Sequence, residues 1–144
     1  MSKINGLLII GLCLGVLSAS LPAHEAHCED TNLGAVMARM KKNLKQLKRA
    51  ARNEDFDQVL ELARTLQEQT RTASAETPLK YRDQNQAFVR LKEDYQTRYD
   101  KLDSQLSQLI HSATAGNTEA VDTTLAQINR TRKDAHKEYR LDCD

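Results

Sequence analysis

Apolar residues recur every three or four positions in four separate segments of the chain. The segments cover residues 33–51, 56–73, 88–113 and 121–139, and most positions between the apolar ones are charged or amide side chains. Spacings of three and four place the apolar residues on one face of an α-helix, whereas a half-buried strand would alternate apolar and polar positions. The pattern therefore predicts an all-α protein with four amphipathic helices that pack on one another.

The residues between these segments are typical of helix ends. Asn53 is predicted to end the first helix and to cap the second, while Gly116 is predicted to stop the third and Asn117 to cap the fourth. The link over residues 74–86 is longer, and Pro78 within it is compatible with an early start of the third helix. Mostly short connections favour an antiparallel up-down-up-down four-helix bundle, in which the first helix begins where the fourth one ends.

Residues 1–23 differ from the rest of the chain. Lys3 is their only charged residue, and it precedes an apolar run that ends in small residues. This is the layout of a secretory signal peptide, with cleavage after Ala23 as the preferred site and after Ser20 as an alternative. The apolar run is too short to cross a bilayer comfortably. The sequence thus predicts an exported, periplasmic protein whose mature domain, residues 24–144, has no membrane span.

Charge and cysteine content narrow the chemistry further. Without Lys3 the mature chain has 20 basic and 20 acidic residues, so no overall basic excess is available to hold nucleic acid or a membrane surface. Charges of both signs follow one another along the chain, as on an ordinary solvated surface. Cys28 and Cys143 are predicted to form a disulfide in an oxidising compartment, with unpaired cysteines as the alternative. There is no CxxCH motif, which excludes covalent haem attachment of the c type.

Two potential metal ligands lie at similar heights in the predicted bundle. Met37 is nine residues after Cys28, and His136 is seven residues before Cys143, so the two side chains are expected within about one helical turn of each other. A thioether and an imidazole facing each other across a bundle can supply both axial ligands of a haem iron.

Three further residues fit such a site. Arg132 lies one turn before His136 in an otherwise apolar stripe and requires an anionic partner, such as a haem propionate. Tyr95 and Tyr99, four residues apart, are flat side chains suited to lining a porphyrin. Each of these residues, Met37 included, also fits an ordinary role in packing, so the residues alone leave both interpretations open.

After the signal, the chain resembles the cytochrome b562 family over essentially its whole length, best in "MARMKKNLKQL" and in "TRKDAHKEYR". The resemblance implies an exported four-helix bundle that binds one haem b without covalent attachment. It also implies that Met37 and His136 are the axial ligands. Tyr95 and Tyr99 correspond to two pocket aromatics that are usually phenylalanines in the family, and Arg132 corresponds to an arginine near the haem. Met40, one turn after Met37, is a rival ligand.

The predicted function is that of an electron carrier rather than an enzyme. Methionine and histidine together fill both axial positions of the iron and leave none for a substrate, and no nucleophile or carboxylate pair is placed for catalysis. The redox partner protein is not identified by the sequence. One alternative is a haem-free helical bundle that binds envelope proteins. Another is metal sensing through His24, His27 and Cys28 in "HEAHCED".

Overall fold

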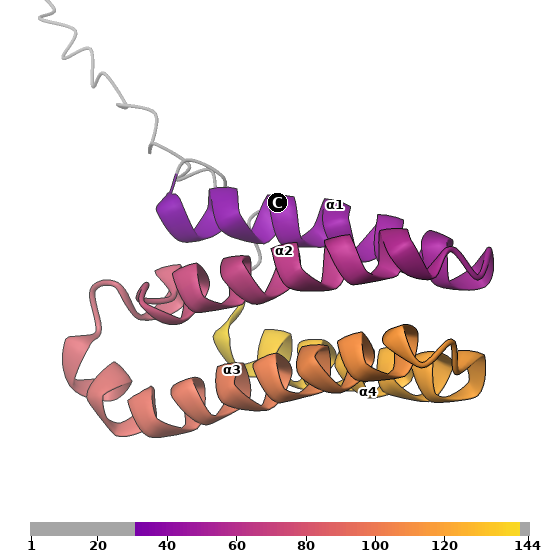
Figure 1. Ribbon diagram of the computed structural model, residues 1–144. Coiled ribbons are helices and arrows are strands. Elements are labelled where there is room, and N and C mark those ends of the chain that lie inside the picture. Colours follow the sequence, from indigo (N-terminus) through magenta and orange to yellow (C-terminus); the bar gives the residue numbers. More distant parts are fainter. Residues whose placement is uncertain (1–30, 142–144) are drawn as a thin grey trace, which may run out of the picture.

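The computed structural model describes residues 31–141 and consists of four α-helices and one short 3₁₀ helix (Figure 1). In chain order the elements are α1 (Asn32–Arg52), α2 (Phe56–Ser74), η2 (Leu79–Tyr81), α3 (Asn85–Thr114) and α4 (Thr118–Tyr139). The described residues contain no strand. The predicted all-α class is therefore confirmed, and each of the four apolar stripes forms one helix.

The helices form an antiparallel bundle in which successive helices are neighbours. Helix α1 packs on α2, α2 on α3 and α3 on α4, and Figure 1 shows the α1–α2 pair lying over the α3–α4 pair. The side formed by α1 and α4 is packed much less closely than the other three. The up-down-up-down bundle is confirmed, and its least packed side lies between the first and the last helix.

Most helix ends follow the predicted capping pattern, with one exception. Asn53 ends α1, but the prediction that it also caps α2 is wrong, because the Asp55 side chain accepts the Gln58 backbone N–H at 3.1 Å. Between them Glu54 adopts a left-handed conformation with φ of 55°, which turns the chain before α2 begins. The Asp55 carboxylate caps the helix and also opposes the positive end of its dipole.

The turn between α3 and α4 matches its prediction. Gly116 has φ of 64°, a backbone conformation that glycine adopts without steric cost, and it follows Ala115, the C-cap residue of α3. The Asn117 side chain then accepts the Ala120 backbone N–H at 3.0 Å and caps α4.

The link between α2 and α3 contains a structured element that the periodicity did not predict. Pro78 is buried and precedes η2, and α3 begins only at Asn85. The early start of α3 at Pro78 is therefore wrong: Pro78 starts a single 3₁₀ turn that brings the side chain of Tyr81 into the interior.

The interior consists of two clusters of different composition. The first, here called the aliphatic core, draws on all four helices. Its buried members are Leu47, Ala50, Ala51, Val59, Ala63, Leu66, Leu106, Leu109, Ala113, Val121, Leu125 and Ile128. The second, here called the aromatic cluster, joins η2, α3 and α4 and consists of Tyr81, Tyr95 and Tyr139 with Phe88, Leu91 and Tyr99 packed against them. The two clusters divide the bundle into an aliphatic half and an aromatic half.

Several predictions concern segments at the two ends of the chain. The signal peptide, Cys28, Cys143, His24 and His27 all lie outside the residues that the structure describes, so these predictions stay as they were. Over residues 31–141, none of the helices combines the length and the apolar character needed to cross a membrane.

Candidate functional site

On α1, the two methionines have different surroundings. Met37 and Met40 are both half-buried, and Met40 packs against the aliphatic core. Among the described residues, Met37 is not one of the side chains packed against either cluster. The Met40 thioether therefore has a clear packing role, whereas the Met37 thioether lies outside both clusters.

On α4, His136 is half-buried one turn before the end of the helix. Burial lowers the pKa of His136 below its ordinary value, and the positive charges of Arg132 and Arg140 lower this pKa further. The neutral imidazole is thus favoured, and a neutral imidazole nitrogen is the form that binds a metal.

A hydrogen bond between α1 and α4 relates the heights of Met37 and His136. Lys48 Nζ donates to Asn129 Oδ1 at 3.1 Å. From this bond, Met37 lies 11 residues toward the start of α1, and His136 lies 7 residues toward the end of α4. Because the helices are antiparallel, both residues lie toward the same end. A difference of four residues is about 6 Å, slightly more than one turn.

Arg132 lies between Asn129 and His136 on α4, and part of its guanidinium is unsatisfied. Its Nη2 donates to Asn129 Oδ1 at 3.2 Å, the same oxygen that Lys48 uses. Its Nε is buried and has no hydrogen-bond partner. A buried donor without a partner is costly, because it has lost its hydration and gained nothing in return. The arginine therefore has the capacity to bind one further acceptor.

Tyr95 and Tyr99 lie on α3, and the structure brings them together. Their rings make an edge contact with centroids 4.9 Å apart, and their hydroxyl oxygens are 3.2 Å apart. The Tyr95 hydroxyl also lies 3.3 Å from the Ala73 carbonyl oxygen on α2, to which it donates. Burial raises the pKa values of both phenols. Both hydroxyl groups are therefore neutral and hydrogen-bonded to protein atoms.

Tyr139 connects this pair to α4. Its ring lies 5.0 Å from that of Tyr95, so the two residues are at the same height on neighbouring antiparallel helices. Tyr99 is four residues after Tyr95, and His136 is three residues before Tyr139. Tyr99 and His136 are therefore within about 1.5 Å of the same height.

The sequence did not identify two members of the aromatic cluster as parts of a site. Tyr139 donates to Asp94 Oδ2 at 2.6 Å, and Tyr81 donates to Glu138 Oε1 at 2.9 Å. Tyr139 was visible only as the last apolar position of its stripe. Tyr81 belongs to no stripe, because it lies on η2, where helical periodicity gives no signal.

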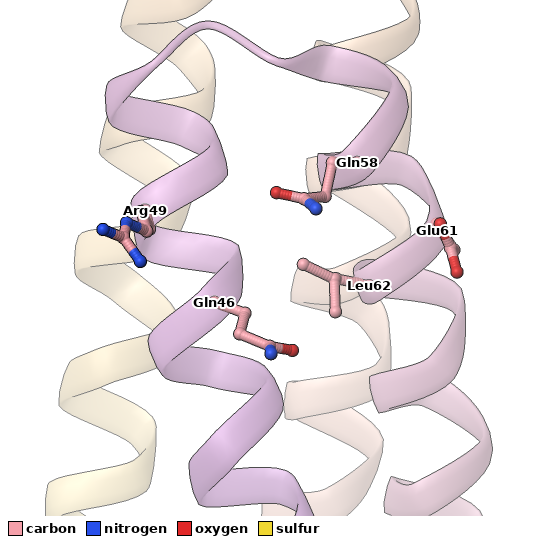
Figure 2. A pocket seen from close by; sticks show the side chains of 5 residues that line it. All are labelled: Gln46, Arg49, Gln58, Glu61 and Leu62. Atoms are coloured by element: carbon pink, nitrogen blue, oxygen red, sulfur yellow. The ribbon is translucent and has the colours of Figure 1, made fainter.

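A surface groove of about 290 Å³ lies elsewhere, between α1 and α2 (Figure 2). It is lined by Gln46, Arg49, Gln58, Glu61 and Leu62. Figure 2 shows Arg49 and Glu61 pointing away from each other at its two sides. Four of the five lining residues are polar, so the groove does not offer the apolar surroundings that a porphyrin needs.

Among residues 31–141, no three or more histidine, cysteine, aspartate and glutamate side chains are grouped so that they could hold a metal ion. A bare cation site of that kind is therefore not present in the described bundle. Met37 and His136 differ from such a site, because they place one thioether and one imidazole on the neighbouring helices α1 and α4, and these two donor types can ligate a haem iron.

A model of a known protein family matches most of the described chain. The family model described as Cytochrome b562 matches residues 32–140, from the first residue of α1 to just beyond the end of α4. The chain belongs to the cytochrome b562 family. No curated individual protein matches the chain.

Membership of the cytochrome b562 family establishes the general activity. The chain is a haem-binding protein of electron transport, and the cofactor of this family is haem b. The donor set found in the bundle fits that cofactor: a thioether, an imidazole held neutral, and a buried arginine N–H without a partner.

Proposed function

We propose that this cytochrome b562 family member carries single electrons by means of one non-covalently bound haem b, with Met37 and His136 as the axial ligands. The observation that carries the assignment is the register of α1 on α4, defined by the Lys48–Asn129 hydrogen bond. It gives Met37 and His136 a height difference of about 6 Å. The sequence between residues 31 and 141 contains no cysteine, so this part of the chain cannot form a thioether bond to a haem vinyl group.

His136 is suited to act as a ligand over a wide pH range. Its pKa is lowered by burial and by the two arginines, so its ring nitrogen stays unprotonated below the pH at which an ordinary histidine gains its charge. A ligand held in the neutral form does not need to lose a proton before it binds the iron.

Arg132 is proposed to bind a haem propionate. Its Nε needs an acceptor, and its charge is opposed by no carboxylate among its hydrogen-bond partners, since Asn129 is neutral. A carboxylate at this position would accept from Nε and compensate the positive charges of Arg132 and Lys48 together.

Tyr95 and Tyr99 are proposed to form an aromatic wall of the haem pocket. Because their hydroxyl groups already have partners in the protein, the rings offer apolar area without leaving a buried hydroxyl unsatisfied. This removes the main physical objection to tyrosines at positions where the family usually has phenylalanines.

The bound haem supplies a one-electron redox couple, and the chain's residues decide how it is used. If Met37 and His136 both bind the iron, oxygen or a substrate would have no free ligand position there, which would suit electron transfer rather than catalysis. Export to the periplasm, after cleavage behind Ala23, is part of the proposal and depends on the signal-like residues 1–23.

Absorption spectroscopy of the mature protein tests the ligand assignment. We expect uptake of one haem per chain and the sharp reduced-state bands of a six-coordinate, low-spin b-type haem. Met37→Ala should lower haem affinity and give a five-coordinate spectrum, because a methyl group cannot replace the sulfur ligand. Met40→Ala is the matched control and should leave the spectrum unchanged.

Two results would contradict the proposal. If Met40→Ala and not Met37→Ala alters the iron spectrum, the sulfur ligand has been assigned wrongly. If the purified protein is colourless and gains no band on addition of haem, the haem-free bundle that binds envelope proteins is the better description.

A further inference from the structure

Helix α1 carries charge of one sign only. Among its 21 residues seven are lysine or arginine and none is aspartate or glutamate. Residues 53–141, by comparison, contain 13 basic and 15 acidic residues. The near-neutral composition of the whole chain thus hides a strongly uneven distribution, and one third of the 21 basic residues of the sequence lie on this helix.

These charges are available at the surface. Six of the seven cationic residues are exposed: Arg39, Lys41, Lys42, Lys45, Arg49 and Arg52. In the described part of the chain, both ion pairs lie outside α1, and none of these six side chains forms a hydrogen bond. In Figure 2, for example, Arg49 points away from Glu61, the one carboxylate among the residues that line the groove. Within residues 31–141, the face is therefore not neutralised by ion pairs or hydrogen bonds.

The positive region continues onto α4. Burial lowers the pKa of Lys48, and the charges of Arg132, Lys133 and Arg52 lower this pKa further. Four cations from two helices are thus close enough to repel one another. We define the cationic face as the six exposed basic residues of α1 together with the exposed Lys133 of α4.

The cationic face runs alongside the proposed haem ligand. Lys41, Lys48 and Arg52 follow Met37 at intervals of four, seven and four residues, which places all four on one stripe of the helix. From Arg39 to Arg52 the face is about 20 Å long. That length fits the small contact areas of transient complexes between redox proteins.

We propose that the cationic face docks the acidic surface of the protein with which this chain exchanges electrons. The electron-transfer part of this inference rests on the proposed function, whereas the docking surface rests on the charges alone. Charge complementarity determines the class of partner, since unpaired lysines and arginines on one helix match a surface rich in aspartate and glutamate. Docking here brings the partner next to Met37 and the weakly packed α1–α4 side.

A protein fits this face better than a lipid surface. A helix that inserts into a membrane interface needs a free apolar side, but the apolar side of α1 is buried against the bundle through Leu47, Ala50 and Ala51. Only electrostatic attraction to anionic lipids would remain, and that alternative is one outcome of the test.

The test compares two triple charge reversals in the mature protein. The first variant carries Lys42→Glu, Lys45→Glu and Arg49→Glu on α1. The matched control carries Arg64→Glu, Arg90→Glu and Lys92→Glu, which are exposed residues of α2 and α3, and it has the same net charge. Circular dichroism confirms that both variants fold, and the haem spectrum should be unchanged in both.

Binding is measured by calorimetry with a plant-type ferredoxin, a small acidic redox protein, at low and at physiological salt. We expect the α1 variant to bind at least about tenfold more weakly than the unaltered protein and the control to differ by less than about twofold. The change from low to physiological salt should weaken ferredoxin binding most for the unaltered protein. Because calorimetry does not depend on haem, failure of haem uptake would leave the docking result intact and contradict only the proposed function.

Electron transfer from reduced ferredoxin to the haem-loaded protein should slow in the α1 variant by a similar factor, because charges on a docking face act mainly on the association rate. Equal weakening in the α1 variant and the control would overturn the proposal, since net charge alone would then explain binding. No binding of ferredoxin by the unaltered protein would also overturn it. Stronger, α1-dependent binding to phosphatidylglycerol vesicles than to ferredoxin would identify a lipid surface instead.

Discussion

The two halves of the interior differ in which helices they join. The aliphatic core takes side chains from all four helices, and several, such as Leu47, Val59 and Leu109, have no exposed area at all. The aromatic cluster takes its side chains from η2, α3 and α4. Among the described residues, its only hydrogen bond to α1 or α2 runs from the Tyr95 hydroxyl to the Ala73 carbonyl oxygen near the C-terminal end of α2. The aliphatic core therefore joins all four helices, whereas the aromatic cluster includes no side chain of α1.

The difference between the two halves indicates which part of the interior can accommodate a cofactor. A close-packed aliphatic interior leaves no space for a cofactor, because protein interiors have few voids larger than a water molecule. The aromatic half leaves Met37 outside both clusters and leaves Arg132 with an unsatisfied donor. The aliphatic core thus includes neither Met37 nor Arg132, two of the residues proposed for the haem site.

The largest loss of stability is expected when a side chain in the aliphatic core is shortened. Leu109→Ala should lower the free energy of unfolding by about 3–5 kcal/mol, through lost burial and a cavity that the four helices cannot close. Urea unfolding followed by circular dichroism measures it. Val89→Ala, at a residue 72% exposed, is the control and should change stability by less than about 0.5 kcal/mol. Equal losses in the two variants would contradict the assignment of the core.

The next effect concerns the ionisation of the tyrosines in the aromatic half. The pKa values of Tyr81, Tyr95, Tyr99 and Tyr139 are all raised, with burial as the largest cause in each case. These raised values contribute stability that is fully present below the unfolded tyrosine pKa near 10 and is lost as the pH rises above it.

Ultraviolet titration of the folded protein should accordingly show no phenolate absorbance near pH 10. The phenolate band should instead appear together with the loss of helical circular dichroism at higher pH. A phenolate signal that precedes unfolding would show that at least one of the four rings is open to solvent.

The smallest effect is expected from removal of one hydroxyl group. Tyr139→Phe deletes the 2.6 Å hydrogen bond to Asp94 and keeps the ring contacts, so the free energy of unfolding should fall by about 1 kcal/mol. The hydrogen bonds from Arg98 and then from Tyr139 lower the pKa of Asp94, so this variant should also lose stability at a less acidic pH than the parent. If the loss of stability at acidic pH is the same in the variant and the parent, the hydrogen bond from Arg98 alone is sufficient to lower the pKa of Asp94.

Much of the fold was predictable from the sequence because it depends on local signals. The three- and four-residue spacing located all four helices, and Gly116 with Asn117 located the turn before α4. The cap of α2 was misassigned by two residues, because Asn53 and Asp55 are both good capping residues and only the left-handed turn at Glu54 decides between them.

The candidate site was predictable only in part. Residues on a regular stripe, such as Met37, His136 and Tyr95, could be selected from spacing. Tyr81 could not be selected, because it reaches the interior from a single 3₁₀ turn. The shared use of Asn129 by Lys48 and Arg132 also depends on the register between the first and the last helix, for which neither helix carries a local signal.

The single-signed charge of α1 has a consequence for the molecule as a whole. With seven positive charges on one helix and a slight negative excess in residues 53–141, the charge of the described bundle is unevenly distributed, which gives it a permanent electric dipole. In the field of a charged body the protein experiences a torque before any contact is made. The orientation of the protein is then biased before contact, and a larger share of collisions with a negatively charged partner begins with α1 facing that partner.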